Sequence, residues 1–271
     1  MHTLNTKQTF GLMAILFGLI SLACIDKTNT TFSKDSKMVK IEGGTFIMGQ
    51  SSGEGDEKPE HEVEISTFYL SKYEVTVAEF RKFCEATDRD MPKTPNWGWI
   101  DDHPVINTTW NDARDYISWL NKTESENYRL PTEAEFEYTI RNGGKEGVYP
   151  REGDAPKHEN LADRSLKKET GSSRIWSNYD DGFPFTAPVG SFEPNPLGVY
   201  DINGNIWEWC SDWYSAYTDN KTINPKGAKT GDNKVGRGGS YNADPWHSRS
   251  ASRSYVEPTF EGPGFRLAKD F

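Results

Sequence analysis

The chain has 271 residues and carries 41 acidic against 31 basic side chains, which gives a formal net charge of -10 at pH 7. Such an acidic protein lacks the basic footprint that nucleic acids require, so we expect none among its partners. Glycine (24) and proline (15) are frequent and only 34% of the residues are hydrophobic, yet the chain has 12 tyrosines and 9 tryptophans. This composition predicts one loop-rich domain whose core depends strongly on aromatic side chains.

The first 23 residues have the pattern of a lipoprotein-type signal peptide. Lys7 precedes an apolar run over residues 10–23, which is too short for a permanent bilayer-spanning helix but suits a secretory signal. Ala23 stands directly before Cys24, as in the lipobox of bacterial lipoproteins, although Ser21 occupies a position where leucine is usual. We expect lipid on Cys24 to anchor the protein in the bacterial cell envelope, at the periplasmic or outer-membrane face. The alternative is a soluble secreted protein.

A polar segment and a single domain follow the signal peptide. Residues 24–37 are predicted to form a flexible tether. From Met38 onward no stretch is polar or repetitive enough to mark a second boundary, so residues 38–271 form the one predicted domain. Cys84 and Cys210 lie within it. In an oxidising compartment they can pair, but the sequence does not give their separation, so a disulfide and two buried free thiols both stay open.

Strand patterns occur at the start of the domain. Residues 39–48 and 63–70 alternate apolar and polar side chains in places, which predicts half-buried strands. Residues 50–61 lie between them and are charged and glycine-containing, so they are predicted to form a loop.

Three helices are predicted farther along the chain. Thr76 and Thr132 are each followed three residues later by glutamate, the capping-box pattern of a helix start. Residues 110–120 place apolar side chains at helical spacing. Gly143-Gly144 is expected to end the third helix. The irregular pattern after this glycine pair predicts no further helix.

The domain also contains short sequence blocks in a fixed order. They are Gly43-Gly44-Thr45-Phe46-Ile47-Met48-Gly49, Tyr73-Glu74-Val75-Thr76, His103-Pro104-Val105, Trp110-Asn111-Asp112-Ala113, Arg129-Leu130-Pro131-Thr132-Glu133-Ala134-Glu135, Asn195-Pro196-Leu197-Gly198, Gly204-Asn205-Ile206-Trp207-Glu208-Trp209, Arg237-Gly238-Gly239-Ser240-Tyr241 and Gly264-Phe265-Arg266. In this order they resemble the formylglycine-generating enzyme family, also called sulfatase-modifying factors. The resemblance implies a single α+β domain of the C-type-lectin-like fold, low in regular secondary structure.

One departure from the family concerns its catalytic thiols. Active members oxidise a cysteine in Cys-x-Pro-x-Arg motifs of sulfatases and hold copper(I) between two thiolates, since soft sulfur selects that ion. Here Ala243 occupies the first cysteine position, and none of residues 245–248, where the second falls, is cysteine. We therefore expect no copper site and favour a noncatalytic protein. A formylglycine-generating oxidase is the alternative, so the enzyme assignment stays open.

The residues that remain around this position indicate binding. The predicted groove residues are Ser240, Tyr241, Trp246, His247 and Arg249, because aromatic and arginine side chains are common interface anchors. Arg253 and Arg266 are expected instead to be internal salt-bridge partners of acidic residues. Asp244 and His247 together offer a carboxylate and an imidazole, the donor types of nonheme iron sites, but we favour His247 as a surface or groove residue.

The resemblance further implies structural calcium in two loops. The first loop would use Asp201, Glu208 and the backbone carbonyls of Gly204 and Ile206. The second would use Asn160, Asp181 and the backbone carbonyls of Leu161 and Phe183. Hard oxygen donors, some of them anionic, are what calcium requires. The alternative is that these acids merely cap turns.

The expected function follows from these features. The resemblance favours a calcium-stabilised, lipid-anchored binding or scaffold component of a cell-envelope complex, like the family's lipoproteins that serve gliding motility and protein secretion. Its expected partner is an envelope protein or an extended peptide.

Overall fold

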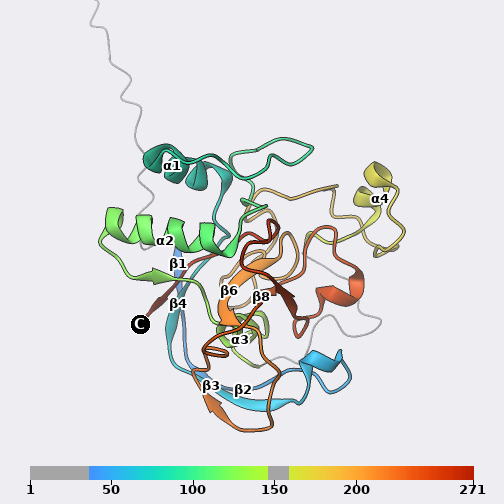
Figure 1. Cartoon of the computed structure of the whole chain (residues 1–271). Helices are drawn as coiled ribbons and strands as arrows, with labels where there is room; N and C mark the ends of the chain where they lie inside the picture. Colours follow the sequence, from blue (N-terminus) through green and yellow to red (C-terminus); the bar gives the residue numbers. More distant parts are fainter. Residues whose placement is uncertain (1–36, 146–158) are drawn as a thin grey trace, which may run out of the picture. The chain divides into compact units, whose positions relative to one another are not determined.

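The computed structural model describes residues 37–145 and 159–271. Figure 1 shows the order of the elements along the chain. The predicted signal peptide, the lipidation residue Cys24 and all of the predicted tether except Lys37 lie outside the described residues. Among the helices that the structure describes, none is both long and apolar enough to cross a membrane.

Three small sheets form the strand framework of the part of the chain that the structure describes. The first has the order β1-β4-β10-β5, with bounds Met38–Ile41, Phe68–Ser71, Ala268–Asp270 and Tyr128–Arg129. The second has the order β2-β3-β7, with bounds Gly44–Met48, His61–Ile65 and Thr222–Ile223. The third has the order β6-β8-β9, with bounds Glu208–Trp213, Lys234–Arg237 and Ser254–Val256. Ala268 of β10 lies opposite both Leu70 and Arg129, so the last strand of the domain is inserted between earlier strands.

The two strand patterns of the sequence correspond to four strands. Residues 39–48 contain β1 and β2, and residues 63–70 contain most of β3 and β4. Gly43 stands at the break between β1 and β2, where a Cβ atom would come within 2.4 Å of the Ile65 carbonyl oxygen. The chain therefore turns from one sheet into the next at a point where only glycine fits.

In the described residues, four α-helices accompany the sheets: α1 (Val77–Thr87), α2 (Trp110–Glu124), α3 (Glu133–Ile140) and α4 (Arg164–Thr170). The predicted capping boxes at Thr76 and Thr132 are confirmed, and α2 begins with a third one at Thr109. The helices α1 and α2 lie side by side (Figure 1). All eight residues of α3 are buried, because this helix packs against β2, β3, β6 and β8.

The helix α4 corrects the prediction that no helix follows Gly144. The Asp163 carboxylate caps it by accepting hydrogen bonds from the backbone N–H groups of Ser165 (2.8 Å) and Leu166 (3.2 Å). Gly171 ends it in a left-handed conformation with φ 76°. A helix of seven residues is too short to show apolar periodicity, so only its two caps marked it in the sequence.

Two apolar clusters form the core. One gathers Phe46, Phe68 and Phe136, and the other gathers Phe80, Phe83, Tyr116, Trp209 and Phe265. The aromatic share of both clusters agrees with the composition. Cys210 belongs to the first cluster and Cys84 to the second, and both are free thiols. Of the two possibilities that the sequence left open, the structure has the free thiols.

Candidate functional site

Buried arginine–glutamate pairs hold the segments around the predicted site together. Arg253 donates to both carboxylate oxygens of Glu133, at 2.6 and 2.8 Å. Arg266 donates to both oxygens of Glu208, at 2.7 Å each. The prediction that these two arginines are internal ion-pair partners is confirmed. The positive charges of Arg253 and Arg266 are therefore neutralised by buried acids within the domain.

Arg249 has the same kind of partner, although the sequence placed it in the groove. Its side chain is buried, and its guanidinium donates to both oxygens of Glu57 at 2.6 Å and to Gln50 Oε1 at 2.7 Å. The Trp246 ring covers it, with the guanidinium carbon 4.0 Å from the ring centroid. Arg249 thus ties the 50–57 loop to its own segment and does not present a free positive charge.

The segment from Ser240 to Ser248 forms a turn followed by a short 3-10 helix, Pro245–Ser248. Ala243 lies in the turn, where its N–H donates to the Ser240 carbonyl at 3.1 Å, and it is 9% exposed. Trp246 and His247 are exposed, with Trp246 at 41%. The Ser248 hydroxyl is buried and has no hydrogen-bond partner among the residues described. The segment therefore offers hydroxyl, amide and carboxylate groups and one exposed imidazole, but no thiol.

Three partly exposed rings, Trp97, Phe185 and Tyr241, form a cluster that we call the aromatic trio. Trp97 and Phe185 stack with 4.2 Å between ring centroids and an interplanar angle of 7°. Tyr241 meets both edge-on, at 5.7 Å from Trp97 and 6.2 Å from Phe185. Burial raises the pKa of Tyr241 to about 12, so its phenol stays neutral at physiological pH. The sequence analysis named Tyr241 alone, because Trp97 and Phe185 approach it only in the folded chain.

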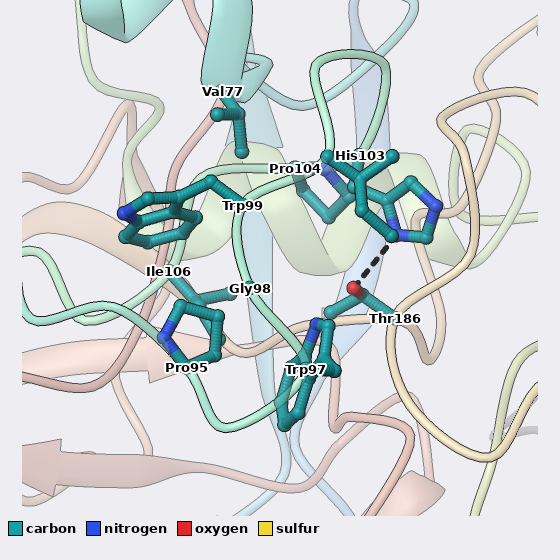
Figure 2. Close-up of a pocket in the computed structure, with 10 residues that line it drawn as sticks. Val77, Pro95, Trp97, Gly98, Trp99, His103, Pro104, Ile106 and Thr186 are labelled. Carbon is teal, nitrogen blue, oxygen red and sulfur yellow. Dashed lines mark hydrogen bonds between the residues drawn. The ribbon is translucent and has the colours of Figure 1, made fainter.

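A pocket adjoins the aromatic trio, and Trp97 belongs to both (Figure 2). Its other lining residues are mainly apolar: Val77, Pro95, Gly98, Trp99, Ile100, His103, Pro104, Ile106 and Thr186. His103 Nδ1 lies 2.9 Å from Thr186 Oγ1, the bond drawn in Figure 2. Burial lowers the pKa of His103, which favours a neutral imidazole. The lining of the pocket is therefore mainly apolar and aromatic.

The first predicted calcium loop is rich in buried carboxylates. Asp201 Oδ2 accepts a hydrogen bond from the Gly190 N–H at 2.6 Å, whereas its Oδ1 is buried and unpartnered within the described part of the chain. Glu208, the second acid of the loop, is paired with Arg266 as above. Glu74, to which the sequence analysis gave no role, resembles Asp201: its Oε2 is buried and has no hydrogen-bond partner among the described residues. Burial raises the pKa of all three carboxyls.

The second predicted calcium loop brings its four residues together. The Asp181 carboxylate accepts the backbone N–H groups of Leu161 (2.9 Å) and Phe183 (2.8 Å). Asn160 is 1% exposed, and its Oδ1 has no hydrogen-bond partner in residues 37–145 and 159–271. Burial raises the pKa of Asp181 to about 7. A cation would satisfy the amide oxygen and stabilise the charged form of the acid.

A metal site made only of acidic, histidine and cysteine side chains is absent from the described residues. The Asp244 carboxylate caps the 3-10 helix by accepting the Trp246 N–H at 3.0 Å, and it lies 3.9 Å from Arg174. Its partners are therefore groups other than the His247 imidazole. Any cation in the two loops would therefore depend on amide and backbone carbonyl oxygens as well as carboxylates.

Known proteins share this architecture and sequence. Residues 25–271 match the family model of the sulfatase-modifying factor enzyme 1-like domain. The formylglycine-generating enzyme of Bos taurus is 33% identical over 88% of this chain and 76% of its own length. The inactive C-alpha-formylglycine-generating enzyme 2 of Bos taurus is 31% identical over 66% of this chain and 71% of its own. The solved structure of PvdO from Pseudomonas aeruginosa superposes with a TM-score of 0.73 and 30% identity, covering 86% of this chain and 94% of PvdO.

These matches confirm the predicted α+β fold and the family resemblance. The family model covers most of the chain, and the fold of PvdO covers 86% of the chain at 30% identity. The chain belongs to the sulfatase-modifying factor enzyme 1-like family, whose members include formylglycine-generating enzymes.

Proposed function

We propose that this chain is a noncatalytic, calcium-stabilised member of its family that binds an extended peptide segment of an envelope protein. The observation that carries the proposal is the combination of an alanine at the turn with the partly exposed rings of the aromatic trio. Ala243 offers no thiol, whereas the aromatic trio offers contact area that interfaces favour.

The two thiols in the described residues give further support for a noncatalytic role. Cys84 and Cys210 are both buried in apolar clusters. Burial raises the pKa of each thiol, so neither is a thiolate at physiological pH. The thiolate is the form that binds soft metals and attacks substrates. A relative of this chain is named an inactive C-alpha-formylglycine-generating enzyme, which supports the noncatalytic role.

The chemistry of the aromatic trio and its pocket indicates the class of ligand. Apolar walls, stacked rings and a neutral His103 suit an uncharged, extended segment with proline or aliphatic side chains. The positive charges closest in sequence to the Ser240–Ser248 segment, Arg249 and Arg237, are paired with Glu57 and Glu137. Binding would therefore depend on ring contacts more than on ion pairs.

Calcium fits both loops. Asn160 Oδ1 and Asp201 Oδ1 are buried oxygens without partners among the residues that the structure describes, and hard cations prefer such donors. The residues that would hold the ions are Asp201, Gly204, Ile206 and Glu208 in the first loop and Asn160, Leu161, Asp181 and Phe183 in the second. The role of the ion would be to hold irregular loops in place.

Export and lipid anchoring complete the proposal. Cys24 follows a secretory-type apolar segment and would carry the lipid that holds the domain at the envelope. Metabolic labelling with a radioactive fatty acid tests this step in a bacterial host. We expect label on the parent chain and none on Cys24→Ser, with Cys84→Ser as the matched control; equal labelling of Cys24→Ser would refute the anchor.

A displayed peptide library tests the binding function directly. Selection against the parent chain is expected to enrich extended peptides whose binding weakens about tenfold or more in Trp97→Ala, because truncating a central aromatic anchor costs about 2 kcal/mol or more. Tyr255→Ala is the matched control, since Tyr255 of β9 is 51% exposed and its ring lies 4.4 Å from that of Tyr214, which is not part of the aromatic trio. If the enriched peptides bind Trp97→Ala as tightly as the parent chain, or if no peptides are enriched, the proposed binding site is ruled out.

A further inference from the structure

One buried asparagine contacts both predicted calcium loops. Asn205 is 1% exposed, and its Oδ1 accepts hydrogen bonds from Asn160 Nδ2 (3.0 Å) and the Ala187 N–H (2.9 Å). Its Nδ2 donates to Glu74 Oε1 at 3.0 Å, and its backbone N–H donates to the Asn160 carbonyl at 2.7 Å. Asn205 therefore links a donor of the second loop to the acid cluster of the first.

The backbones of the two loops are also in direct contact. Gly204, a carbonyl donor of the first loop, has φ +87°, and a Cβ atom there would come within 2.5 Å of the Asn160 carbonyl oxygen. Asn205 itself has φ 57°, a left-handed conformation that asparagine tolerates well. A displacement of the first loop must therefore move Asn160 as well.

Asn205 fixes the orientation of the Asn160 amide. Both donor positions of Asn160 Nδ2 are used, one by Asn205 Oδ1 and the other by the Phe185 carbonyl at 2.8 Å. The unpartnered Oδ1 is the atom left for a cation. Losing the bond from Asn205 would free the amide to rotate and would weaken the second loop as a site.

The Asn205 Nδ2 group contacts Glu74, one of the carboxylates beside the first loop. Glu74, Asp201 and Glu208 lie close enough to interact electrostatically, and Arg266 is the cation that compensates them. When ionised, these three carboxylates exceed the one guanidinium by two negative charges, which a divalent cation would neutralise. Without the cation, their repulsion acts directly on Glu74, the residue that Asn205 holds.

We propose that Asn205 is a positioning residue that couples the two loops, so that calcium in one loop raises the affinity of the other. The inference rests on the calcium binding proposed above. Coupling between linked sites typically changes affinity between about 5-fold and 150-fold, and the change is the same in both directions.

Calorimetric titration of the full chain with calcium tests the coupling. Asp181→Asn disables the second loop and Asp201→Asn the first, and Asn tolerates the left-handed φ of residue 201. In the parent background we expect each substitution to weaken calcium binding in the remaining loop by about fivefold or more. Glu62→Gln removes an exposed acid outside both loops, so it is the control and should change neither affinity.

The role of Asn205 is then tested in the same titration. Asn205→Gly keeps the backbone conformation and its hydrogen bonds but removes the bridge, so the two loops should bind independently. Asn203→Ala is the matched control, because the Asn203 side chain is buried nearby and neither of its polar atoms has a hydrogen-bond partner among the described residues. If Asn205→Gly does not fold, Asn205→Asp keeps the bonds from Asn160 and Ala187, loses the donation to Glu74, and should still weaken the coupling.

The outcomes separate the two proposals. If the calcium affinity of one loop is unchanged when the other loop is disabled, the coupling is overturned, but the proposed calcium sites are retained. Coupling that survives in Asn205→Gly overturns the role of Asn205. A parent chain that binds no calcium overturns the sites and the coupling together.

Discussion

At the scale of single residues, the sequence identified buried ion pairs but not their partners. Arg253 and Arg266 were predicted to be internal, yet Arg253 pairs with an acid 120 positions away and Arg266 with one 58 positions away. Such distances in sequence carry no local signal. The same reason explains why Arg249 was predicted in the groove: Glu57, its partner, is 192 positions distant.

The pair of Arg253 with Glu133 gives a stability prediction. Arg253→Met leaves the buried Glu133 with the more distant Arg237 guanidinium and the Tyr217 hydroxyl but without its bidentate partner, and breaking a buried pair in this way costs about 3–5 kcal/mol of unfolding free energy. Urea denaturation measures the change. Lys221→Met is the control, because Lys221 and its partner Glu62 have side chains 53% and 44% exposed and such pairs contribute about 0–1 kcal/mol. Equal losses in the two variants would contradict the assignment.

Asp212 gives a prediction about pH. Burial, followed by the nearby Glu133 charge, raises the pKa of Asp212 from 3.8 to about 7. The folded state then binds this proton more tightly than the unfolded state. The protonated carboxyl therefore contributes to the unfolding free energy at low pH, and this contribution is lost as pH rises from about 4 to about 7. For one group the slope is at most about 1.4 kcal/mol per pH unit.

Denaturation at about pH 5 and about pH 7, with a chelator present, checks this slope. The unfolding free energy of Asp212→Asn should fall less steeply with rising pH than that of the parent. The difference in slope should be at most that of one titrating group. Asp180→Asn is the control, since that exposed carboxyl has a lowered pKa and should leave the slope in this interval unchanged. An Asp212→Asn chain that keeps the slope of the parent would disprove the account.

At the scale of elements, local signals predicted what is local. The capping boxes at Thr76 and Thr132 were correct, because each depends on residues three apart. The strands were predicted as two long runs where the structure has four short ones, since the break at Gly43 is imposed by contact with Ile65 of a neighbouring strand. The helix α4 was missed because it is set by its caps and not by periodicity.

The cap of α1 gives the prediction at this scale. Thr76 Oγ1 accepts the Glu79 N–H at 3.2 Å, and Glu79 Oε2 accepts the Thr76 N–H at 3.0 Å. Thr76→Ala should therefore cost about 1 kcal/mol of unfolding free energy. Thr76→Ser keeps the hydroxyl and should stay close to the parent in the same denaturation experiment. A serine variant as weak as the alanine variant would mean that the methyl group, not the cap, matters.

At the scale of the whole molecule, the ordered sequence blocks predicted the family and the fold, and the family model and the structure of PvdO confirm them. The candidate site was only partly predictable. Tyr241 lies in one of the blocks, but the aromatic trio needs Trp97 and Phe185 from two other segments. Likewise Glu74 and Asn205 were visible as parts of blocks, while their contacts with the predicted calcium loops appear only in the fold.

The central claim, a binding protein built on an enzyme's fold, is tested most directly by mass spectrometry. The full chain is incubated with a Cys-x-Pro-x-Arg peptide, copper, oxygen and a reducing thiol, beside an active formylglycine-generating enzyme as control. The account predicts that the control converts the peptide cysteine to an aldehyde while this chain leaves the peptide mass unchanged. Aldehyde formed by this chain would contradict the account and would require a catalytic centre other than a thiolate pair at Ala243.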